Sequence, residues 1–164
     1  MTVGDGMSDL EKVRLQAVRF LARREYCEQE LTRKLTSRGA SLESAQQVVD
    51  ELKGRDMIND ARFAQALVRV RMSKGYGPIK IRNELRQKGV SSDLIDSSLD
   101  FNREVWLDQI VGILRRKYKE VPPANFTEWA KRARFLQGRG FSTSQIRLTL
   151  GDFGEPDQAN VSMQ

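Results

Sequence analysis

Basic side chains recur at matched positions along this sequence. They are the residues whose types and spacing most clearly indicate a binding function. Arg19, Arg69 and Arg134 stand at one repeated position, and a second repeated position is basic in every copy. Guanidinium and ammonium groups bind phosphates and carboxylates. The pattern therefore predicts a stripe of anion-binding side chains. The candidate set is Arg19, Arg24, Arg69, Lys74, Lys80, Arg82, Arg134, Arg139 and Arg147.

The second repeated position holds Arg24, Lys74 and Arg139. A structural alternative exists for it, because each cation is also able to clamp an acidic group of its own repeat. In the first repeat such a group is Glu25 or Glu30. Both interpretations stay open on the sequence alone.

The overall charge agrees with an anionic partner. The 164 residues contain 28 Lys and Arg against 22 Asp and Glu, a formal net charge of +6. Such an excess is typical of proteins that bind nucleic acid or an acidic protein surface.

Enzyme chemistry is disfavoured by the composition. The chain has no histidine, which removes the commonest general base and the commonest metal ligand. Its one cysteine, Cys27, has no partner for a disulfide or a zinc site. Arg24 and an expected helix start beside Cys27 favour a lowered thiol pKa, although a lone thiol is more simply incidental. We expect no enzymatic activity, no cofactor and no metal.

A repeated segment indicates the architecture that positions the basic residues. Residues 24–40 and 74–90 share a skeleton at a shift of 50 residues, with Leu31 matching Ile81 and Leu35 matching Leu85. A fainter third copy covers residues 139–154, which match 74–89 at a shift of 65 residues. The larger shift implies an insertion of 15 residues, which we assign to a helical stretch over 105–118 and the break at "VPPAN".

Helix signals surround each copy. "SDLE" at 8–11 is a capping box, and we expect Ser41, Asn59 or Asp60, and Ser91 or Ser92 to start later helices. Apolar residues follow each start at helical spacing. The sequence thus predicts an all-α fold of tandem three-helix, helix-turn-helix-like repeats that form an elongated curved array. The expected divisions are a flexible leader over 1–8, repeat 1 over 9–54, repeat 2 over 55–102, an inserted helix and proline-containing break over 103–123, and repeat 3 with a short or frayed end over 124–164.

An aromatic residue marks the joint between the first two helices of each repeat. These residues are Tyr26, Tyr76 and Phe141. The rings either plug the joint or stand ready to stack on bases or touch a partner. A recurrent aromatic at a repeat joint favours packing.

No apolar run approaches the roughly 20 residues that span a bilayer. The first residues lack the basic and apolar segments of a secretion signal. We expect a monomeric cytoplasmic protein with no membrane partner.

Several strings resemble those of the RecX family, bacterial regulators of the recombinase RecA. They are "RREYCEQELTRKL" with the following "RG", "MINDARFAQALVRVR" and "KGYGPIKIRNELRQKGV". The resemblance is close over 17–99 and weaker, though in the same order, over 129–154. It implies tandem three-helix repeats, and a regulator that binds the RecA–DNA filament and lowers its ATPase and strand-exchange activities. Recombination, DNA repair and the SOS response are the processes implied, and single- or double-stranded DNA is part of the expected contact.

A plain DNA-binding protein is the alternative from another class. Helix-turn-helix-like units enter DNA grooves, and a sequence-specific reader needs Asn, Gln or Arg on a shared recognition face. The expected second helices, "EQELTRKL" and "IKIRNELRQK", share no such pattern. Direct base readout is therefore disfavoured.

Overall fold

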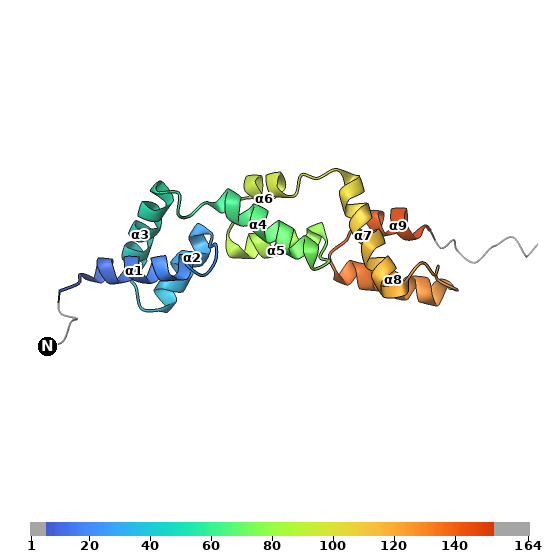
Figure 1. Ribbon diagram of the computed structural model, residues 1–164, viewed down its shortest axis with the longest axis horizontal. Helices are drawn as coiled ribbons and strands as arrows, with labels where there is room; N and C mark the ends of the chain where they lie inside the picture. The colour runs from blue at the N-terminus through green and yellow to red at the C-terminus, as the bar shows by residue number, and fades with distance from the viewer. Residues whose placement is uncertain (1–5, 153–164) are drawn as a thin grey trace, which may run out of the picture. The chain divides into compact units, whose positions relative to one another are not determined.

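The computed structural model describes residues 6–152, and within them the chain forms nine α-helices and no strand (Figure 1). The all-α prediction is confirmed. The helices are α1 (Asp9–Leu21), α2 (Glu28–Ser37), α3 (Leu42–Gly54), α4 (Asp60–Ser73), α5 (Pro78–Lys88), α6 (Ser92–Ser98), α7 (Arg103–Tyr118), α8 (Phe126–Gly138) and α9 (Thr143–Leu150).

The chain divides into two compact units. Of the described residues, one unit contains 6–69 together with Arg82–Leu99, and the other contains Val70–Ile81 and 100–152. The segment α4–α6 therefore contributes to both. The predicted leader lies partly, and the predicted end of repeat 3 largely, outside the described residues. The elongation and curvature of the array stay predictions, as do the repeat boundaries.

Local signals start and stop the helices where the sequence predicted. The Ser8 side chain accepts a hydrogen bond from the Glu11 amide at 3.2 Å, and Glu11 Oε2 accepts one from the Ser8 amide at 3.0 Å. Ser41 accepts the Ser44 amide at the start of α3 in the same way. Gly39 ends the α2 turn with φ +100°, a conformation that costs glycine little. These bonds satisfy helix-end groups that have no partner inside the helix.

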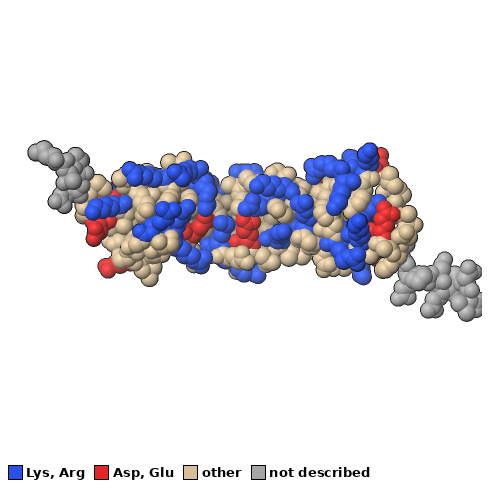
Figure 2. Space-filling view, turned by 90° about the horizontal axis from the view of Figure 1, so that it is seen from below, with Lys and Arg blue, Asp and Glu red and all other residues tan. Residues whose placement is uncertain are grey.

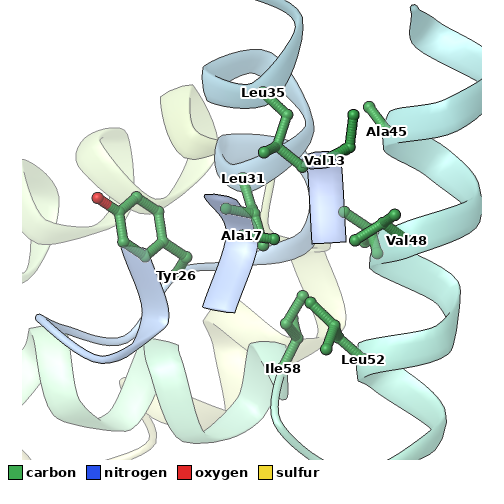
Figure 3. Close-up of a cluster of buried hydrophobic side chains, with 10 residues drawn as sticks. Val13, Ala17, Tyr26, Leu31, Leu35, Ala45, Val48, Leu52 and Ile58 are labelled. Atoms are coloured by element: carbon green, nitrogen blue, oxygen red, sulfur yellow. The ribbon is translucent and has the colours of Figure 1, made fainter. Parts of the chain in front are cut away.

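The apolar stripes of α1, α2 and α3 close the first core (Figure 3). Ala17 from α1, Leu31 from α2 and Val48 from α3 are fully buried and point toward one centre. No single helix of 10 to 13 residues buries its stripe alone. The three together remove these side chains from water, which is the main stabilising term.

The first repeat packs on the end of α5 and on the start of α4. The Cys27 thiol donates a hydrogen bond to the Lys88 carbonyl at 3.2 Å, and the Glu28 amide donates one to Asp60 at 2.9 Å. A Cβ added at Gly89 would lie 2.1 Å from Gln29 Oε1. Glycine at this position is therefore required for the approach as well as for its φ of +89°. These contacts join the first three helices to α4 and α5 within one compact unit.

The second unit is built from α7, α8, α9 and the turn that joins α4 to α5. Trp106 and Ile110 of α7, Leu136 of α8, and Phe141 and Ile146 near α9 are buried. The α4–α5 turn binds the chain after α8 through its backbone. The Gly77 amide donates to the Arg139 carbonyl at 2.7 Å, and the Ile79 amide donates to the Gly140 carbonyl at 2.9 Å.

Gly77→Ala should destabilise the protein by about 1–3 kcal/mol, the usual cost of overpacking. Its added Cβ would lie 2.5 Å from the Gly140 carbonyl carbon and oxygen. Gly112→Ala is the matched control, because nothing lies within 4 Å of that Cβ. It should be neutral or stabilise α7 by up to about 1 kcal/mol. Urea unfolding of both variants measures the difference, and equal stabilities would show that the turn is not tightly packed.

Candidate functional site

One repeated basic position is exposed to solvent in every copy. Arg19 on α1, Arg69 on α4 and Arg134 on α8 are all exposed. Within residues 6–152 none of the three takes part in an ion pair. Arg19 also lines a shallow hollow with Lys12 and Arg38. These three arginines are thus available to an external anion.

At the second repeated position, Arg24 forms an ion pair within its own repeat, whereas Lys74 is exposed. The Arg24 guanidinium pairs with Glu30, donates to the Glu25 carbonyl at 2.9 Å, and lies 3.7 Å from the Tyr26 ring centroid. The clamp interpretation therefore describes Arg24. Lys74 is exposed, and no ion pair of its ammonium group occurs in the described part of the chain.

Arg139 is half-buried and binds backbone instead of a carboxylate. Its Nη1 donates to the Lys74 carbonyl at 3.2 Å. Its guanidinium lies 5.4 Å from the Tyr76 ring centroid and 5.2 Å from that of Phe135. These contacts hold the side chain in place without pairing its charge with a carboxylate.

Two of the remaining candidates are paired, and one lies on a ring. Arg82 forms an ion pair with Asp96 at 2.6 Å, and Arg147 forms one with Asp152 at 3.5 Å. The ammonium of Lys80 lies 4.7 Å from the Tyr76 ring centroid. Arg82 and Arg147 are both at least one-third exposed, so such pairs are weak and open readily to a competing anion.

The joint aromatics are packed to different degrees. Tyr26 and Phe141 are buried, at 3% and 1% exposure, which agrees with the packing interpretation. Tyr76 is half-buried, and cations lie near its ring. Burial of Tyr26 and Phe141 leaves neither ring open for stacking on bases.

The structure adds two basic residues that the sequence analysis missed. Arg116 and Lys117 from the last turn of α7 line one groove with Lys74 and Arg139. The sequence signal for them is the run "RRKY" at 115–118, at the end of the predicted helical stretch 105–118. Lysine and arginine side chains cover a large part of the surface seen in Figure 2, with acidic side chains in smaller groups among them.

Of the two interpretations of Cys27, the structure contradicts the lowered pKa and leaves the incidental thiol. The thiol is fully buried, and this burial raises its pKa above the ordinary value. Its hydrogen bond to the Lys88 carbonyl gives it a packing role instead.

Metal chemistry finds no support in the described residues, where no group of three or more histidine, cysteine or acidic side chains is placed to hold an ion. None of the described helices is long and apolar enough to cross a membrane.

Three family models match the chain in succession. They describe the first, second and third three-helix domains of RecX, and they cover residues 14–52, 59–99 and 104–150. A curated regulatory protein RecX from Halorhodospira halophila is 37% identical over 148 residues, which is 90% of this chain and 92% of that protein. The chain belongs to the RecX family. A RecX from Stenotrophomonas maltophilia is 40% identical over 80% of this chain and 81% of its own length.

Solved structures agree on the fold. The crystal structure of RecX from Lactobacillus salivarius aligns with a TM-score of 0.75 at 22% identity, over 87% of this chain and 94% of the other. A second RecX crystal structure aligns with a TM-score of 0.71 at 26% identity, over 87% and 71%. The prediction of tandem three-helix domains is confirmed. The third family model begins at residue 104 and so includes α7 within its domain.

Membership in a family of regulatory proteins confirms the prediction that this protein is not an enzyme. The roles of the candidate basic residues stay predictions.

Arg24→Gln should lower the free energy of unfolding by about 1 kcal/mol, since it loses an ion pair and a cation–π contact. Arg19→Gln, from an exposed and unpaired arginine, should leave that free energy unchanged. Thermal unfolding of the two variants provides the comparison. Equal melting temperatures would contradict the division of roles between the two positions.

Cys27 should resist a disulfide reagent such as dithionitrobenzoate in the folded protein at about pH 8, because burial disfavours its thiolate. Unfolding in urea should make it react fully. Cys27→Ala provides the background signal. Rapid labelling of the folded protein would show that the thiol is accessible.

Proposed function

We propose that this protein binds the filament that RecA forms on DNA and inhibits its ATPase and strand-exchange activities. Through that inhibition it modulates recombination, DNA repair and the SOS response in the bacterial cytoplasm, as a monomer and without a cofactor. The single observation that carries the proposal is the succession of three RecX domain matches along this chain.

The chemistry of the basic positions supports this proposal. Arg19, Arg69 and Arg134 are exposed, and no carboxylate pairs with them in the part of the chain that the structure describes. A nucleoprotein filament offers both phosphates and carboxylates to such groups. Each contact is modest, and several together give a salt-sensitive attachment.

The direct test adds the purified protein to RecA assembled on single-stranded DNA and follows ATP hydrolysis. Hydrolysis should fall as the protein is added. If inhibition disappeared whenever naked DNA was supplied in excess, competition for free DNA would be the better account. That result would favour the plain DNA-binding protein over the filament regulator.

The Arg19→Glu/Arg69→Glu/Arg134→Glu variant should need at least about tenfold more protein for half-inhibition, because three anion contacts are lost. The matched control is Arg55→Glu/Arg86→Glu/Lys131→Glu, which makes the same charge change at exposed positions outside the candidate set. It should inhibit nearly as well as the unmodified protein. Circular dichroism checks that both variants remain helical. Equal effects of the two triple variants would assign the loss to net charge alone.

A further inference from the structure

The groove in the second unit is lined by four basic side chains and no acidic one. Lys74 comes from the α4–α5 turn, Arg116 and Lys117 from the end of α7, and Arg139 from the chain after α8. Ser73, Gly75, Ile113 and Phe135 complete the lining. Three segments that are distant in sequence thus bring their cations to one place.

The contacts that position these cations are with aromatic rings and backbone, and they do not neutralise the positive charge. The Lys117 ammonium lies 3.5 Å from the Phe135 ring centroid, and Arg139 lies 5.2 Å from the same centroid. Arg139 also donates to the Lys74 carbonyl at 3.2 Å. Among the described residues no carboxylate forms an ion pair with any of the four cations. Their mutual repulsion is unfavourable, and a bound anion would relieve it.

The lining chemistry favours a phosphodiester backbone over bases or a protein. Cations lie close to the Phe135 ring, so the groove offers no open platform for stacking a base. Protein interfaces have an apolar centre and are poor in lysine. Here two of the four cations are lysines, and Ile113 is 8% exposed. Lysine and arginine around a groove are the usual contacts of nucleic-acid phosphates.

We propose that this groove binds consecutive phosphates of the DNA backbone without reading its bases. The inference deepens the proposed function and rests on it for the source of the DNA, which is the strand held in the filament. It assigns a DNA contact to the third domain and to two residues, Arg116 and Lys117, outside the repeated basic positions.

The test measures binding of a short fluorescein-labelled oligo-dT to the full protein by anisotropy, in the absence of RecA. The Arg116→Gln/Lys117→Gln variant loses two groove cations. The matched control is Arg115→Gln/Lys119→Gln, which removes two charges from exposed side chains at the same end of α7 that do not line the groove. Lys74→Gln is a third variant, in an exposed turn, that stays informative if the α7 variant folds poorly.

Each phosphate contact on single-stranded DNA contributes about fivefold at about 0.1 M salt, from a slope of about 0.7 per contact. The groove variant should therefore bind roughly 25-fold more weakly, and its salt slope should fall by about 1.4. Lys74→Gln should lose about fivefold. The control should change little.

Equal losses in the groove variant and its control would overturn the proposal, and so would unchanged affinity in the groove variant and in Lys74→Gln. Unchanged oligonucleotide affinity with weaker binding to DNA-free RecA would assign the groove to an acidic protein surface. The ATPase assay separates this inference from the proposed function. Oligonucleotide binding through the groove without RecA inhibition would refute only the proposed function, and inhibition without oligonucleotide binding would refute only the groove.

Discussion

Burial of short apolar stripes in groups of three helices is the constraint on which this structure depends. Leu31 and Leu35 on α2 are fully buried, and Ile81 and Leu85 are fully buried at the matching places on α5. A helix of about ten residues is not stable by itself in water, so its stability comes from the partners that cover its stripe. Loss of one partner exposes the stripes of the other two.

Because the apolar face of each helix is buried, charged side chains occupy the outer face. Arg19, Arg69 and Arg134 point away from cores that Ala17, Val68 and Leu136 enter from the same helices. When the spacing of buried apolar residues repeats, the exposed positions that hold these arginines repeat at the same spacing. The three aligned arginines therefore need no special local structure to be exposed, because each lies on the outer face of an amphipathic helix.

Two glycines make very close contacts at the joints, one with a side chain and one with backbone. Gly89 approaches Gln29 in the first unit, and Gly77 approaches Gly140 in the second. Such contacts leave no room for a side chain, which explains why the joints use glycine. The second joint also places the carbonyl of Lys74 within reach of Arg139, and so helps to build the basic groove with α7.

The sequence by itself determined the helices, the repeat and the buried positions, because capping and apolar spacing act over a few residues. Ser8, Ser41 and the Leu31–Leu35 pair were all predictable in this way. Only the tertiary structure decided which aligned cation is free. Arg24 is clamped by Glu30, whereas Arg139 binds the carbonyl of Lys74, 65 positions earlier in the chain. Neighbours distant in sequence also place Arg116 and Lys117 in the basic groove and bury Cys27. The charge and pKa environment of a side chain depends on what packs against it, and no local pattern encodes that partner.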